Sequence, residues 1–253
     1  MLELEARAEP SRLMSWASPL LAVALMLVGG LVVFAALGKD PVEGFRVFFL
    51  NPVKDLYALS ELLLKATPLM LCAIGLAIGF RANVWNIGAE GQFMLGAVAA
   101  TGVALYFGDS ESALVLPAMV LAGAAGGAAW AAIPALLRTR FNANEILVSL
   151  MLVYVAQLFV SWLVFGPWKD PDGFNFPQTR MFAEAATLPM VIEGTRLHFG
   201  FAIALAALVA GYAFMNRSHA GFRMRVAGEA ADAARYAGFS ATRMIWVDRK
   251  SVV

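Results

Sequence analysis

Six long apolar runs dominate the chain, and shorter segments between them hold most of its charged residues. Each run is long enough for a helix across the bilayer core, which takes about 20 residues. The predicted spans are Ala17–Gly38, Leu62–Phe80, Val84–Phe107, Ala113–Leu137, Ile146–Trp168 and Phe199–Asn216. The pattern therefore predicts an all-α, polytopic transmembrane helical bundle with about six spans in this chain.

The connectors predict how the spans are oriented. Arg138 and Arg140 lie in the short Arg138–Glu145 loop, whereas the Gly108–Ser112 turn has no basic residue. Basic residues in short loops favour the cytoplasmic side, so we expect both ends of the six-span segment, and thus the N-terminus, in the cytoplasm. The first run exceeds the about 7–15 apolar residues of a signal peptide, which predicts an uncleaved first span.

Composition supports a membrane protein and excludes several other classes. The chain is 60% hydrophobic and 15% charged, whereas a soluble domain has about 25% charged residues. A net charge of +1 gives no reason to expect nucleic-acid binding. The single cysteine, Cys72, cannot form an internal disulfide. No phosphate-binding loop, metal-ligand spacing or nucleophile–base set is present, so we predict no cofactor, no metal and no catalytic residue.

A polar motif, Arg81–Gln92, interrupts the apolar pattern between the second and third runs. Its side chains cannot share one helical stripe at ~100° per residue, and Gly88 favours a break or a tight helix start. Polar groups in a span line a cavity, pair with one another, or contact a substrate. Two interpretations remain, a substrate pathway or a hydrogen-bond network that braces the bundle. The predicted pathway residues are Asn83, Trp85, Asn86, Glu90 and Gln92.

Two further segments carry local signals. Asn144 is a predicted N-cap and Glu145 suits the first turn of the next helix, in which Gln157 lies deeper. Gly221–Gly238 is too polar to span, and Glu229–Ala237 is predicted to be a short Ala-rich helix that ends at Gly238. Such a helix on the cytoplasmic face would suit docking into a groove of another protein.

Four segments together resemble one known family. They read FRANVWNIGAEGQFMLGA, NEILVSLMLVYVA, GPWKDPDGFNFPQ and GFRMRVAGEAADAARYAG. Between about Leu62 and Ile245 the chain resembles permease subunits of bacterial ABC importers, in the nucleoside and simple-sugar branch related to ribose and branched-chain amino acid permeases. It departs from the family pattern at Val153, where an Asn is expected, which bears on any substrate contact from that turn.

The resemblance implies a multi-pass protein of the bacterial inner membrane that moves nucleosides or simple sugars into the cytoplasm. It also implies three kinds of protein partner: a cytoplasmic ATP-binding subunit, a second permease subunit and an extracytoplasmic solute-binding protein. ATP hydrolysis would belong to the partner, so this chain would not be an enzyme. Residues implied to couple to the ATPase are Gly221, Arg223, Gly228, Glu229, Ala234, Arg235 and Gly238.

The resemblance also sets expected domain limits. Residues 1–246 are expected to form an incomplete transmembrane permease domain, with a cytoplasmic coupling segment at 217–243, because family members continue with further spans. Residues 248–253, which translate a common sequencing-adapter read-through, are interpreted as a non-native tail.

Two alternative functions compete with an importer. The first is a secondary carrier of a small polar solute that uses Glu90 as its coupling group, which would leave the Gly221–Gly238 segment without an ATPase to bind. The second is a non-transporting membrane scaffold, which would leave the Arg81–Gln92 motif unexplained.

Overall fold

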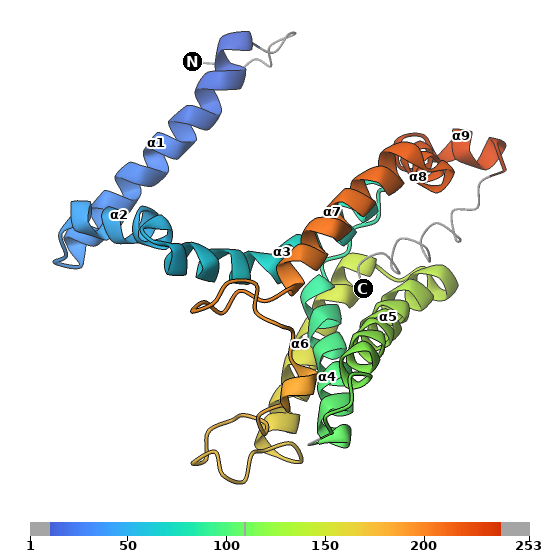
Figure 1. Cartoon of the computed structure of the whole chain (residues 1–253). Helices are drawn as coiled ribbons and strands as arrows, with labels where there is room; N and C mark the ends of the chain where they lie inside the picture. The colour runs from blue at the N-terminus through green and yellow to red at the C-terminus, as the bar shows by residue number, and fades with distance from the viewer. Residues whose placement is uncertain (1–10, 109, 239–253) are drawn as a thin grey trace. The chain divides into compact units, whose positions relative to one another are not determined.

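The computed structural model describes residues 11–108 and 110–238, and its regular elements there are helices, as predicted (Figure 1). In chain order they are α1 (Arg12–Ala36), α2 (Pro41–Phe49), η1 (Asn51–Val53), α3 (Leu56–Arg81), α4 (Ala89–Phe107), α5 (Val115–Phe141), α6 (Glu145–Phe165), η2 (Glu184–Ala186), α7 (Gly200–Arg217), α8 (His219–Glu229) and α9 (Ala231–Tyr236). The tail at 248–253 and the last part of the coupling segment, 239–243, lie outside the described residues.

Within the described residues, five helices are long and apolar enough to cross a membrane: α1, α3, α5, α6 and α7. The sequence predicted six spans, and the third of them, Val84–Phe107, corresponds to α4. This helix begins only at Ala89 and is not among the five. Its first turn holds Glu90 and Gln92, whose polar side chains lower the mean hydropathy of the helix. The expected third span is therefore a 19-residue helix, shorter than α3 and α5, that carries two polar side chains in its first turn.

The chain divides into two compact units after Leu62, and the first contains α1 and α2. The segment between the first two predicted spans contains α2, because Asp40 caps this helix and Pro41 occupies its first turn. The Asp40 carboxylate accepts hydrogen bonds from the Val42 and Glu43 N–H groups at 2.8 and 3.4 Å, which satisfies two otherwise unpaired donors.

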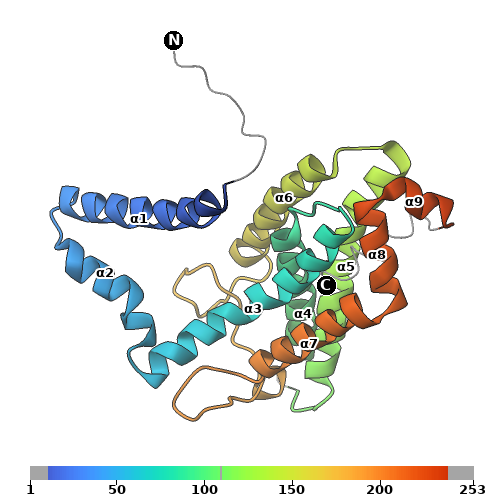
Figure 2. The same cartoon turned by 90° about the horizontal axis from the view of Figure 1, so that it is seen from above.

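The second unit contains α4 packed between α5 and α6 (Figures 1 and 2). Glycines allow the backbones of α4 and α5 to come close. A Cβ atom on Gly96 would lie 3.0 Å from the Gly123 carbonyl oxygen, and one on Gly126 would lie 3.0 Å from the Leu95 carbonyl oxygen. This contact agrees with the small-residue faces that favour close packing of membrane helices.

The end of the second unit contains α7, α8 and α9, and the predicted helix limits need correction there. Ser218 ends α7 and its hydroxyl caps α8 by accepting from the Gly221 N–H at 2.9 Å. Glu229 closes α8 and does not begin the short helix, which is α9. Gly238 follows α9 with a φ of +77°, a conformation that favours glycine, so the predicted helix end is confirmed.

Candidate functional site

The polar motif forms a break between α3 and α4, as predicted. The α3 helix ends at Arg81, and the chain turns through Asn83, whose φ of 55° is one that asparagine tolerates better than most residues. The Asn83 side-chain oxygen accepts a hydrogen bond from the Trp85 indole N–H at 3.2 Å. Gly88 is the N-cap of α4, and a Cβ there would lie 3.0 Å from Ser149 Cβ, so the break packs tightly against α6.

Asn86 and Gln92 form a buried pair of side-chain amides, and each of the two residues is only 3% exposed. The Asn86 Nδ2 donates to Gln92 Oε1 at 3.2 Å, and the Gln92 Nε2 donates back to Asn86 Oδ1 at 3.3 Å. The same Asn86 oxygen accepts from the Gly88 N–H at 3.1 Å. These bonds join the loop to the first turn of α4, and they satisfy polar groups that would be costly to bury alone.

Glu90 is exposed, as are Asn83 and Trp85, whereas Asn86 and Gln92 are buried. The Glu90 carboxylate accepts a hydrogen bond from the Gln157 side chain of α6 at 3.4 Å. The structure thus brings together Asn86 with Gln92 and Asn83 with Trp85, while Glu90 pairs with a different helix. The five residues do not form one cluster.

Glu145 anchors the motif loop to the start of α6. Its Oε1 accepts a hydrogen bond from the Trp85 backbone N–H at 3.1 Å, and its Oε2 forms an ion pair with Arg138 of α5. The side chain of Glu145 is only 10% exposed and that of Arg138 is 30% exposed, so the carboxylate is the more shielded partner. Asn144 caps α6 as predicted, by accepting from the Ile146 and Leu147 N–H groups.

Sequence reasoning missed the joining role of Arg138 and Glu145. It placed Arg138 in a loop, whereas α5 continues to Phe141 and includes it. The only local signal is a pair of opposite charges that flank a short turn. The link to Trp85 spans 60 positions and has no local signal.

The coupling segment packs against the start of the motif. Met224 of α8 is 2% exposed and packs with Ile78, Ala82 and Val84. A Cβ on Gly228 would lie 2.1 Å from the Arg81 carbonyl oxygen, so α8 and the end of α3 meet backbone to backbone.

The predicted coupling residues divide by exposure. Gly221 and Ala234 are buried, and Gly228 is half-buried at the contact with Arg81. Arg223, Glu229 and Gly238 are exposed, while the side chain of Arg235 lies outside the described part of the chain. One side of α8 therefore contacts the bundle, while the charged residues Arg223 and Glu229 are exposed away from that contact.

Comparison with known proteins gives a consistent set of relatives. The family described as "Branched-chain amino acid transport system / permease component" matches residues 58–248. A glucose ABC transporter permease protein of Haloferax volcanii is 39% identical over 94% of this chain and 65% of its own length. A guanosine ABC transporter permease protein of Bacillus subtilis is 30% identical over 90% of this chain and 65% of its own.

A nucleoside ABC transporter permease protein of Lactococcus lactis is 26% identical over 90% of this chain and 64% of its own length. The chain thus spans about 65% of the length of the curated relatives it matches. No solved structure matches it.

Proposed function

Because the chain belongs to the family of branched-chain amino acid transport permease components, we propose that it is the membrane-spanning subunit of an ATP-binding cassette importer. Its apolar helices make it a multi-pass membrane protein. Its solutes would be nucleosides or simple sugars, since relatives named for glucose and guanosine align over nine-tenths or more of the chain. Family membership favours an importer over a secondary carrier that uses Glu90.

The placement of α8 is the structural observation that supports the proposal most directly. Met224 and Gly228 hold α8 against the end of α3, which leaves Phe222, Arg223 and Glu229 exposed. None of these residues lies in a candidate span. An exposed aromatic residue among charged ones suits a protein interface, where aromatic and arginine side chains are enriched. The proposed occupant is the cytoplasmic ATP-binding subunit.

In this proposal an extracytoplasmic binding protein delivers the solute and a second permease subunit completes the path. ATP binding and hydrolysis on the partner subunits move α8, and the contact between Gly228 and Arg81 transmits that movement to the motif loop. The chain supplies the solute path and the coupling surface. In this orientation both α8 and the N-terminus lie on the cytoplasmic side.

A charge reversal on α8 tests the docking role. Glu229→Lys in the full-length protein should reduce recovery of the ATP-binding subunit in a pull-down about tenfold or more, because a like-charge contact in an interface costs several kcal/mol. Uptake of labelled guanosine or glucose should fall with it. Glu111→Lys, an equally exposed position in the turn before α5, is the matched control and should leave both unchanged. Wild-type pull-down and uptake with Glu229→Lys would reject the docking role.

A further inference from the structure

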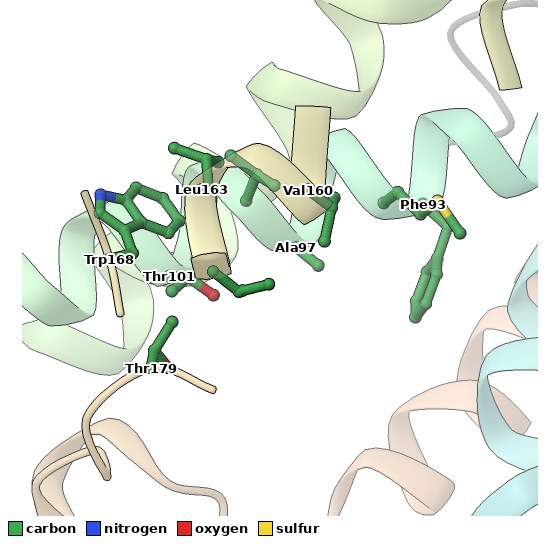
Figure 3. A pocket seen from close by; sticks show the side chains of 10 residues that line it. Phe93, Ala97, Thr101, Val160, Leu163, Trp168 and Thr179 are labelled. Atoms are coloured by element: carbon green, nitrogen blue, oxygen red, sulfur yellow. The ribbon is translucent and has the colours of Figure 1, made fainter. Parts of the chain in front are cut away.

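A cavity of about 190 Å³ lies between α4 and α6 and beside the loop that follows α6 (Figure 3). Its walls are mostly apolar, and none of its side chains is charged. The lining residues are Phe93, Met94, Ala97, Val98 and Thr101 of α4, Val160, Leu163 and Val164 of α6, and Trp168 and Thr179 beyond α6. In Figure 3 Trp168, Thr101 and Thr179 gather at one end of the cavity and Phe93 lies at the other.

Trp168 owes its position to the turn that ends α6. The predicted span Ile146–Trp168 stops at Phe165, and the Trp168 N–H then donates to the Leu163 carbonyl oxygen at 2.8 Å. The indole reaches α4 at Gly102, where a Cβ would lie 3.7 Å from two of its ring carbons. The side chain therefore forms a fixed aromatic wall at the cavity.

Hydroxyl groups stand beside this aromatic wall. Among the described residues the Thr101 hydroxyl has no hydrogen-bond partner, and the Thr179 hydroxyl bonds only to the neighbouring Arg180 carbonyl at 3.3 Å. Thr101 is six residues before the end of α4, or about 9 Å along the helix at 1.5 Å per residue. A ligand that entered from the end of α4 beside Trp168 would meet these groups first.

The polar pair of Glu90 and Gln157 lies on the same helix faces as the cavity. Residues 90, 93, 97 and 101 follow one stripe of α4, and residues 157, 160 and 164 follow one stripe of α6, at the three- and four-residue spacing that aligns helical side chains. The stripe therefore runs from hydroxyls and an indole, across apolar residues, to a carboxylate and an amide.

We propose that this α4–α6 cavity is a solute-binding subsite for a neutral ring that carries hydroxyl groups, with Trp168 as the stacking surface and Thr101 and Thr179 as hydrogen-bonding partners. The inference rests on the proposed transport function and adds the location and chemistry of the site. Binding pockets commonly combine apolar walls with a few polar groups that orient the ligand. The uncharged lining favours a neutral ligand over an ionised one.

A sugar ring and a nucleoside both have the required chemistry. Each offers a flat face to stack on an indole and several hydroxyls to pair with threonine. A lipid chain could fill the apolar walls but could not pair with the Thr101 hydroxyl, and burying a hydroxyl without a partner is unfavourable. The reactivity of a cysteine placed in the cavity distinguishes these occupants.

Protection of a reporter cysteine tests the site. The full-length transporter in proteoliposomes would carry Cys72→Ala and Ala97→Cys, because Ala97 lines the cavity and contributes no polar group. Glucose or guanosine should slow the reaction of this cysteine with a small thiol reagent several-fold. Protection by one solute and not the other identifies the ring source and supports the site in either case. A cysteine at Glu111, in the turn before α5, should react equally with and without solute.

Substitutions in the cavity should weaken protection. Trp168→Ala should raise the half-protecting solute concentration about tenfold, as expected for loss of a stacking contact, and Trp168→Phe should restore part of it. Thr101→Val should raise it as well. Trp162→Ala is the matched control, because Trp162 is 60% exposed on α6 and does not line the cavity.

Three results would overturn the proposal. The first is an unreactive Ala97→Cys, which would mean that lipid or protein covers the cavity. The second is a reactive cysteine that neither solute protects. The third is protection that Trp168→Ala and Thr101→Val leave unchanged. This measurement needs no ATP hydrolysis. A failed pull-down with the ATPase would therefore refute the docking role while leaving the cavity result to stand on its own.

Discussion

Asn86 and Gln92 hold each other through two hydrogen bonds in a site that water hardly reaches. Each amide has its polar groups satisfied mainly by the other, and the pair fastens the motif loop to α4. Such bonds would brace the bundle, which is the alternative to solute contact that the sequence left open. Glu90 is exposed and accepts a hydrogen bond from Gln157, so it stays a candidate for solute contact.

The amide pair should show strong energetic coupling. Asn86→Leu or Gln92→Leu alone leaves a buried amide without its partner, which generally costs about 1–3 kcal/mol. The double variant removes both polar groups, so its loss of stability should be clearly smaller than the sum of the two single losses. Thermal unfolding of the purified protein in detergent would measure the three variants. Additive losses would show that the two amides do not act as a pair.

At the element scale, the contact between α8 and α3 connects the proposed docking surface to the motif. The carbonyl oxygen of Arg81 occupies the space that a side chain on Gly228 would need. One residue further, Ala82 packs on Met224, and the Trp85 N–H binds Glu145. The motif loop thus contacts α8 at one end and α6 at the other. A displacement of α8 would therefore shift the Asn86–Gln92 pair.

Gly228→Ala should push α8 away from α3, because the added Cβ would stand 2.1 Å from a backbone oxygen that cannot rotate aside. We expect a destabilisation of about 1–3 kcal/mol and reduced recovery of the ATPase. Gly29→Ala in α1 is the matched control, since nothing lies within 4 Å of its Cβ, and it should be neutral or slightly stabilising. Melting temperature and pull-down on the same preparations provide the comparison. Equal behaviour of the two variants would contradict the close contact.

For the whole molecule, the proposed orientation places α8 and α9 on the cytoplasmic side and the loop after α6 outside. Single cysteines can report this in a Cys72→Ala background. Met181 and Ala230 are suitable positions because both are exposed, whereas Gly173 is buried beside Gln178.

Met181→Cys in intact cells should react with a membrane-impermeant thiol reagent, and Ala230→Cys should react only after the membrane is permeabilised. The expected ratio of labelling before and after permeabilisation is near one for the first position and near zero for the second. The reversed pattern would overturn the orientation inferred from Arg138 and Arg140.

The helices and their breaks follow from the sequence because their causes are local. Apolar runs predicted α1, α3, α5, α6 and α7, and Asn144 predicted the start of α6 through a cap that acts within three residues. Polar residues beside Gly88 predicted the break before α4. Where a limit was wrong, as at Glu229, the end of the preceding helix decided the outcome.

Tertiary structure alone decided which of these local features meet. Trp85 and Glu145 are 60 positions apart, Arg81 and Gly228 are farther, and the partner of Glu90 is on another helix. Such contacts depend on how helices pack, and packing depends on the summed shape of many side chains across the bundle. For the same reason the sequence alone located neither the α4–α6 cavity nor the role of Trp168, whose position requires a turn, a glycine and two helices together.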